Sequence, residues 1–310
     1  MAHYLKSLTH RSLATFAELT RIMLPVMVVV RVGEEFGLSQ TLGHLLGPVM
    51  GLVGLPPEAG VVWAVGLLTG LYGGIGAYLG LLPELGLTIA EHSVLCAMML
   101  MAHAIPVEQT IVRRAGASFA ITSLLRIGGA LVYGAAVAWI CDVTGALSAP
   151  LDTVWLTGGQ GDPGWTSWAV ATAKSFISIL GVIVLLFIVL DALEALGVMR
   201  WLARMLEPLL QGIGLDPRLA PLTAIGSILG LTYGGGLIIQ STKEHRSSPR
   251  ARFLALVCLS LSHSLIEDTA LMLALGADIW IVLVGRIAFT LAVVATLARI
   301  LDRVPKSAYG

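Results

Sequence analysis

The chain has 310 residues, of which 56% are hydrophobic and 12% are charged, and its formal net charge is zero. Soluble domains carry roughly 25% charged residues, so this composition excludes an ordinary soluble enzyme, a disordered chain and a basic nucleic-acid-binding protein. The three cysteines form no Cys-x-x-Cys pair and no even-numbered set, which argues against a disulfide framework. The composition predicts an all-α integral membrane protein.

The first predicted elements are an N-terminal segment, a transmembrane helix and an amphipathic helix. Residues 1–19 carry basic side chains, and no small-residue cleavage site follows the next apolar run. We therefore expect a retained helix over about 20–40 rather than a signal peptide. The stretch over 42–55 is amphipathic and ends in proline and glycine, which is typical of a helix lying in the membrane interface.

The next apolar run, residues 57–82, is interrupted in its middle by a glycine-rich segment at 69–74. Two hydrophobic helices are predicted after it, over about 88–112 and 117–141. A loop over 142–177 follows, in which aspartates outnumber basic residues. The first half thus contains three predicted spans and one broken run.

The second half repeats the first at an offset of 160 residues. At that offset His103 coincides with His263, and Arg126 coincides with Arg286. Chance matches between two apolar halves explain some coinciding glycines, but not histidine and arginine in one register. We infer a duplication, with repeats at 20–141 and 178–301. The predicted elements of the second half are helices over about 175–197, 252–275 and 278–301, an amphipathic stretch over 199–215 and a broken run over 217–240.

Each broken run is long enough to span a bilayer, or to enter and leave it on one side as a re-entrant hairpin. The hairpin alternative gives each repeat three spans and places most of the 19 basic residues on the cytoplasmic side. The sequence therefore predicts two inverted repeats, each with three transmembrane helices, an interfacial helix and a re-entrant hairpin. Residues 1–19 and a tail over 302–310 are expected in the cytoplasm, beneath a bacterial-type inner membrane, with the loop over 142–177 outside.

A shift of one residue from the repeat register aligns a Tyr-Gly-Gly motif in both broken runs. Glycine allows a tight turn and the close approach of a ligand, and tyrosine adds a ring and a hydroxyl. Because non-helical backbone at membrane depth needs protein or a water-filled cavity around it, the motifs predict substrate-binding hairpin tips. Close helix packing through small residues is the alternative. The predicted substrate-binding residues of the tips are Tyr72, Gly73, Gly74, Tyr233, Gly234 and Gly235.

Ionisable side chains inside the predicted spans form a second set. His263 and Glu267 are four residues apart on one helix face, and Asp268 follows, whereas His103 and Glu108 are five apart. A shift of one residue pairs Glu108 with Glu267. A histidine beside a carboxylate can relay a proton, bind a divalent metal or hydrogen bond a polar solute. We predict that these residues carry proton or cation coupling.

Two arginines, Arg126 and Arg286, also fall inside predicted spans. They either neutralise the carboxylates of Glu108 and Glu267 or bind an anionic group of the substrate, and we include them in the predicted binding site. The alternative for all these buried polar groups is internal pairing between helices, without a ligand.

The order of span, interfacial helix, glycine-rich hairpin and two spans resembles the Gate, or nucleoside recognition, domain. The resemblance is carried by residues 46–57 and 206–217, by the two glycine-rich tips and by the segment from His263 to Thr269. It implies an inverted-repeat transport core, often oligomeric, with substrate held between hairpin tips and broken helices. The chain lacks the extra N-terminal spans of concentrative nucleoside transporters, and it has no GxxxxGK[ST] motif like that of the GTPase in ferrous-iron transporters.

These observations predict a secondary transporter of a small polar solute, nucleoside-like or an organic anion, that is coupled to a proton or cation. Two alternatives stay open: a divalent metal as the cargo, and a non-transport membrane subunit of a partner complex. Neither GxSxG nor HExxH occurs, so we expect no enzyme and no cofactor. The expected partners are the lipid bilayer, the transported solute, the coupling ion and further copies of the chain, but no nucleic acid.

Overall fold

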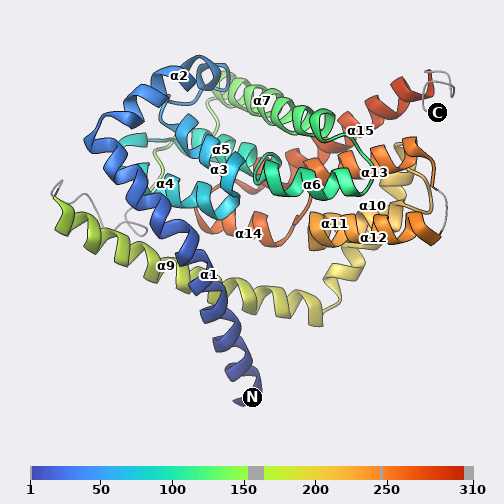
Figure 1. Ribbon diagram of the computed structural model, residues 1–310, viewed down its shortest axis with the longest axis horizontal. Coiled ribbons are helices and arrows are strands. Elements are labelled where there is room, and N and C mark those ends of the chain that lie inside the picture. Colours follow the sequence, from blue (N-terminus) through green and yellow to red (C-terminus); the bar gives the residue numbers. More distant parts are fainter. Residues whose placement is uncertain (1, 153–163, 245–246, 304–310) are drawn as a thin grey trace.

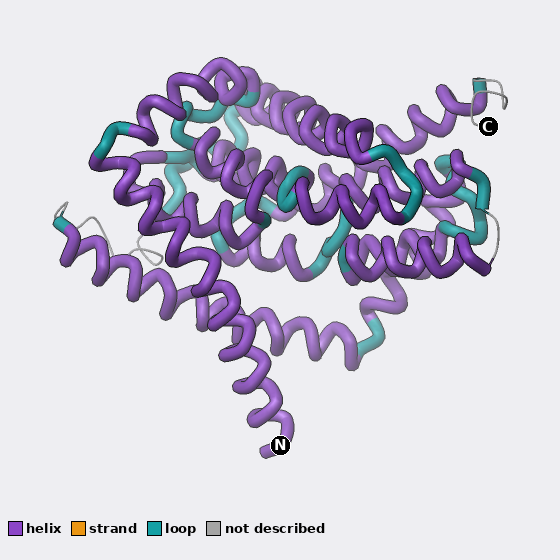
Figure 2. Tube along the Cα trace, viewed as in Figure 1, coloured by secondary structure: helices purple, strands orange, loops and turns teal. Residues whose placement is uncertain are grey.

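The computed structural model describes residues 2–152, 164–244 and 247–303. Within these ranges the secondary structure is helical, apart from one isolated bridge between Thr88 and Pro150 (Figure 2). Five segments of the described chain are long and apolar enough to cross a membrane, so the chain is an all-helical membrane protein. These segments are His3–Glu35, Ile89–Arg114, Phe119–Thr144, Trp165–Ala195 and Trp280–Asp302.

The two halves of the chain carry the same order of helices (Figure 1). The first half contains α1 (Ala2–Glu35), α2 (Leu38–Leu52), α3 (Ala59–Thr69), α4 (Leu71–Leu85), α5 (Ile89–Met101), α6 (Ile105–Arg114) and α7 (Phe119–Thr144). The second half contains α9 (Trp165–Ala195), α10 (Val198–Gly212), α11 (Ala220–Leu229), α12 (Leu231–Glu244), α13 (Pro249–Leu261), α14 (Glu267–Ala274), the π-helix η1 (Trp280–Gly285) and α15 (Arg286–Asp302).

Each broken run folds into a helical hairpin. The chain reverses at Gly70, where φ is 112°, and a Cβ added to Gly66 would lie only 3.6 Å from the Cα of Gly74. In a continuous helix these two residues would be about 12 Å apart. The second hairpin, α11 and α12, reverses in the same way at Gly230, where φ is 107°. Positive φ at both turns favours glycine, and the small residues let the paired helices approach closely.

The centre of the fold is built on α5 and α13. Every residue over 92–101 and over 254–261 is buried. The hairpins, α7 and α15 pack around these two helices. The long apolar helices α1 and α9 cross on one side of this body, where Arg11 and Asp191 form an ion pair (Figure 1). The buried C-terminal ends of α5 and α13 therefore lie inside the molecule.

The helices differ from the predicted elements in three places. The first helix begins at Ala2 rather than near residue 20, because no glycine or proline interrupts the chain before Pro25. The helix α9 likewise begins at Trp165 rather than near residue 175. Six spans were predicted but five segments qualify, because the interruption between α13 (ending at Leu261) and α14 (beginning at Glu267) is longer than the one between α5 and α6.

Candidate functional site

Two central helices are interrupted at equivalent positions. The first interruption separates α5 from α6 and the second separates α13 from α14. Ala104 and Ser264, which are 160 residues apart, adopt φ of 46° and 48° there, a region that residues other than glycine rarely occupy. Backbone of this kind inside a membrane protein needs partners from the surrounding structure.

The hairpins supply those partners. The amide of Ala104 donates to the carbonyl of Gly66 at 3.0 Å, and the amide of Leu265 donates to the carbonyl of Ser227 at 2.9 Å. The hairpin turns also touch the interruptions: a Cβ added to Gly70 would lie 3.7 Å from the Cβ of Ala104. Each hairpin thus holds one broken helix in place and brings its turn next to a histidine.

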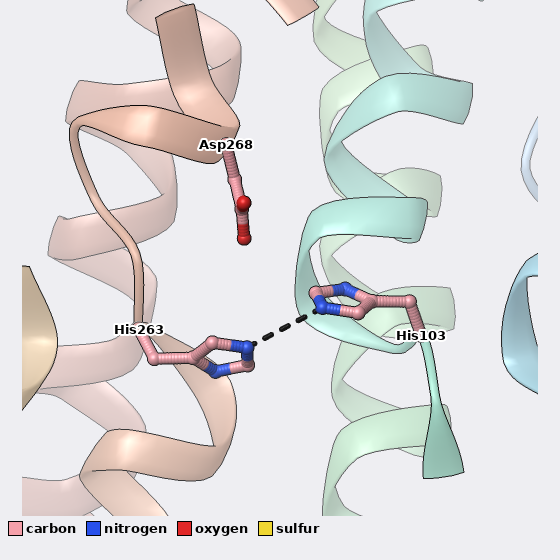
Figure 3. Close-up of side chains that lie close together, drawn as sticks. All are labelled: His103, His263 and Asp268. Carbon is pink, nitrogen blue, oxygen red and sulfur yellow. Dashed lines mark hydrogen bonds between the residues drawn. The ribbon is translucent and has the colours of Figure 1, made fainter. Parts of the chain in front are cut away.

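The two histidines of the interruptions meet at the centre of the molecule (Figure 3). The Nε2 atoms of His103 and His263 are 3.4 Å apart, and the two residues are only 5% and 2% exposed. They are separated by 160 residues, which is the offset of the repeat. The contact therefore joins equivalent positions of the two repeats.

Backbone carbonyls fix the orientation of both imidazole rings. The Nδ1 atom of His103 lies 2.8 Å from the carbonyl oxygen of Met99, and Nδ1 of His263 lies 2.9 Å from that of Leu259. Because a carbonyl oxygen can only accept, each Nδ1 carries the proton and donates it. In the neutral tautomer, each Nε2 then presents a lone pair to the other ring.

Glu108 joins the two histidines to a buried arginine. Its Oε1 lies 3.2 Å from Nε2 of His103 and 3.2 Å from Nε2 of His263, while its Oε2 is paired with Nη1 of Arg126. Arg126 also donates from Nε to the carbonyl of Met101, at the end of α5, at 2.8 Å. A cation at a helix C-terminus stabilises the unpaired carbonyls there. The structure thus brings four predicted site residues together around the Glu108 carboxylate.

Arg286 occupies the equivalent place in the second repeat but has different partners. It donates from Nε to the carbonyl of Leu261 at 3.3 Å and from Nη2 to the carbonyl of His263 at 2.9 Å. Both arginines are fully buried. One nitrogen of each guanidinium, Nη2 of Arg126 and Nη1 of Arg286, has no hydrogen-bond partner among the described residues.

The carboxylate that corresponds to Glu108 is Asp268, not Glu267. Asp268 follows Glu108 by 160 residues, and ligand atoms of Asp268, His103 and His263 all lie within 4.8 Å of one another (Figure 3). Glu267 is exposed instead. The one-residue shift that paired Glu108 with Glu267 matched residue letters, whereas the fold keeps positions in register.

The same correction applies to the tyrosine and glycine motifs. Gly74 packs against Gly66, and Gly234 packs against Gly226, so these glycines correspond without any shift. The turns lie at Gly70 and Gly230, and the motif residues begin the helices after them. Tyr72 is partly buried, whereas Tyr233 is 53% exposed.

The two other predicted glycines of these motifs also lie in close contacts. Gly73 lies beside the side chain of Thr69, and Gly235 lies beside Ile111. The observed contacts of all four glycines are thus those of helix packing, the alternative that the sequence left open.

Several buried polar residues near the site were not singled out from the sequence. Gln109 is fully buried, and neither atom of its amide has a partner among the described residues. Ser227, Ser262 and Thr290 line a cavity of about 10 Å³ beside α13, which is room for about one water molecule. For Ser227 and Thr290 the available signal was a polar residue within an apolar run, and for Gln109 and Ser262 it was their place next to Glu108 and His263.

A larger cavity, of about 440 Å³, lies at the other end of α5. Its lining includes Thr88, Glu91 and Asp142. The Glu91 side chain accepts from the Thr88 amide and the Thr88 hydroxyl accepts from the Glu91 amide, a capping box that begins α5. This cavity is separate from the pair of histidines, because α5 runs about 20 Å between its two ends.

Comparison with known proteins supports the resemblance to the Gate family. The Gate family, described as nucleoside recognition, matches residues 16–122 and 176–278. A protein of Bacillus subtilis strain 168, the uncharacterised membrane protein YvoD, is 28% identical over 283 residues, which cover 90% of this chain and 88% of that protein. No solved structure matches the chain. The family matches confirm both the predicted resemblance and its presence in two copies.

Proposed function

Because the chain belongs to the Gate family, we propose that it is a secondary transporter that moves a small polar solute by alternating access. The observation that carries the proposal is the contact between His103 and His263, one from each repeat, at the interruptions of two central helices. Ionisable groups buried within a membrane are costly and commonly mark solute or ion pathways. Two copies of one motif meeting at such a place supply a site that both repeats can share.

The proposed topology is a pair of inverted repeats over 20–141 and 178–301. Each repeat has three transmembrane spans, with α2 or α10 lying in the interface and the glycine hairpin re-entering the membrane. An odd number of spans in each repeat inverts the second relative to the first, and basic residues then gather on the cytoplasmic side. The divided helix α13–α14 serves as the sixth span, with its interruption filled by the second hairpin. The bacterial relative supports a cytoplasmic membrane.

The solute site is proposed beside the histidine pair, between the hairpin turns. The unpaired nitrogens of the Arg126 and Arg286 guanidinium groups favour a solute with an anionic or carbonyl group, because a buried donor without a partner is costly. The description of the family favours a nucleoside-like solute, and the two arginines favour an organic anion. In this proposal, the solute also contacts Tyr72, Tyr233 and the glycines beside them when the hairpins move apart.

The coupling groups are His103, Glu108, His263 and Asp268, with Glu267 at the exposed edge. Binding of protons or of a cation would change the charge of this cluster. The free energy needed to separate the two repeats would then change as well. Further copies of the chain are expected to pack through the long apolar helices α1 and α9.

Transport in proteoliposomes tests the proposal. Purified protein is reconstituted, and uptake of radiolabelled nucleosides and small organic anions is measured with and without an imposed pH gradient. We expect gradient-dependent uptake of at least one solute, and a fall to the level of empty liposomes in His263→Ala and Glu108→Ala. His44→Ala, which replaces an exposed histidine, is the matched control and keeps full uptake. Absence of uptake for every solute, with folded protein in the membrane, supports a non-transport subunit instead.

A further inference from the structure

We propose that His103, His263, Glu108 and Asp268 bind one divalent first-row transition-metal ion between the two repeats. The inference rests on the proposed function, because it names the cation that the transporter binds. It is carried by the geometry of the cluster, in which two repeats contribute one imidazole and one carboxylate each.

The first argument is that the atoms that meet are all hydrogen-bond acceptors. Nε2 of His103, Nε2 of His263 and Oε1 of Glu108 face one another, and all three are acceptors when the imidazoles are neutral. The protons of both rings are directed away, toward the carbonyls of Met99 and Leu259. Three lone pairs that converge without a proton repel one another, so a cation must occupy the space between them. That cation is either a proton or a metal ion.

The second argument is the size of the space. The three atoms form a triangle with sides of 3.4, 3.2 and 3.2 Å. For metal–nitrogen and metal–oxygen bonds of about 2.0–2.1 Å, neighbouring ligand atoms of a tetrahedral ion are about 3.3 Å apart. The triangle therefore already has the dimensions of one face of a tetrahedral site, without any movement of the side chains.

The third argument is the surroundings of the ligands. Metal-bound histidines characteristically donate the other ring proton to a carbonyl or carboxylate, as both do here. Arg126 holds the second oxygen of Glu108, which leaves the first oxygen for the ion. Asp268 is the candidate fourth ligand, since its carboxylate points toward both histidines and lies within 4.8 Å of a ligand atom of each (Figure 3). It would move closer when an ion binds, because neighbouring ligand atoms of a tetrahedral ion are about 3.3 Å apart.

The ligand set also selects the type of ion. Imidazole nitrogens suit zinc, iron, cobalt and nickel, whereas calcium and magnesium prefer oxygen ligands alone. Two nitrogens and two carboxylates therefore favour a first-row divalent ion over an alkali or alkaline-earth cation.

Cobalt binding to the purified full chain tests the inference. The protein is stripped with EDTA and titrated with Co²⁺, whose visible absorption is intense in a tetrahedral site, and Zn²⁺ binding is measured by calorimetry. We expect one ion per chain, with affinity reduced at least 100-fold in His103→Ala and His263→Ala and about 10-fold in Asp268→Asn. His44→Ala leaves the affinity unchanged.

A ligand exchange keeps the test decisive if the alanine variants unfold. His263→Cys retains a ligand and is expected to bind Co²⁺ with a new sulfur-to-cobalt charge-transfer band. Failure of the unmodified protein to bind Co²⁺ or Zn²⁺, or binding that is unchanged in all the cluster variants, overturns the metal site and leaves a shared proton. Metal binding without transport of any solute contradicts the proposed function alone, and solute uptake without metal binding contradicts this inference alone.

Discussion

The two interruptions of the central helices are equivalent in sequence position but different in their contacts. In the first repeat, Glu108 reaches both imidazoles and is paired with Arg126. In the second, the shorter Asp268 has no such ion pair with Arg286 among the described residues, and Arg286 donates to two backbone carbonyls instead. The two repeats are therefore not equivalent in their contacts, which is compatible with the alternating access between inverted repeats that we propose.

The largest expected difference between the repeats lies in the two arginines. Arg126→Ala leaves the Glu108 carboxylate buried without its partner, which costs about 3–5 kcal/mol of unfolding free energy. Arg286→Ala leaves two backbone carbonyls with one partner fewer, and we expect about 1–3 kcal/mol. Unfolding in detergent, followed by circular dichroism, measures both values. An equal loss in the two variants would contradict the asymmetry described here.

The second largest difference is expected in the stability cost of adding a methyl group to each hairpin. A Cβ on Gly226 would lie 2.6 Å from the Cα of Gly234, whereas a Cβ on Gly66 would lie 3.6 Å from the Cα of Gly74. Gly226→Ala therefore overpacks its hairpin and is expected to cost about 1–3 kcal/mol. Gly66→Ala makes an ordinary contact and serves as the matched variant, with little change in melting temperature. A larger loss in Gly66→Ala would reverse the comparison.

The lengths of the two carboxylate side chains offer a sharper test. Glu108→Asp removes the methylene group that lets the carboxylate reach both imidazoles, and we expect about a tenfold fall in uptake, equivalent to about 1.4 kcal/mol. Asp268→Glu lengthens the opposite side chain, and combining it with Glu108→Asp is expected to restore part of the activity. Initial rates in proteoliposomes measure the effect. No recovery in the double variant would mean that the two positions are not interchangeable.

The smallest predicted effect concerns backbone strain. Ala104 adopts a φ of 46°, which costs a residue with a Cβ about 1–2 kcal/mol. Ala104→Gly should therefore raise the unfolding free energy by about 1 kcal/mol. Ala97→Gly, within the continuous part of α5, should lower it by about 0.5–1 kcal/mol. Changes of opposite sign in the unfolding free energy would confirm that the turn at Ala104 is strained. A decrease in both variants would contradict the strain.

Much of this architecture could be predicted from the sequence because membrane helices are marked by long apolar runs. Repeated patterns revealed the offset of 160 residues and the two hairpins. Polar residues in an apolar setting indicated that His103 and Arg126 pair with Glu108. The sequence could not align the two repeats to the exact residue. Matching residue types paired Glu108 with Glu267, whereas Asp268 holds the equivalent position.

Other features depend on contacts that no local pattern reveals. The second interruption is not followed by a proline, whereas Pro106 stands in the first turn of α6 after the first interruption. The division of the second helix therefore depends on the hairpin that packs against it. The π-helical turn at the start of the last span is another case, since Tyr133 donates its hydroxyl to the carbonyl of Ile281 across 148 residues. Contact between His103 and His263 likewise requires the fold of both repeats.

The opposite orientation of the two repeats is the central claim, and labelling of single cysteines tests it most directly. In a background with the three native cysteines replaced, Arg113→Cys reports on the loop after α6, and Asp278→Cys reports on the equivalent region after α14. A membrane-impermeant thiol reagent is applied to vesicles of known orientation. The account predicts that the two positions are labelled from opposite faces, with Arg113→Cys accessible from the cytoplasm. Labelling of both from the same face would contradict inverted repeats and the shared site between them.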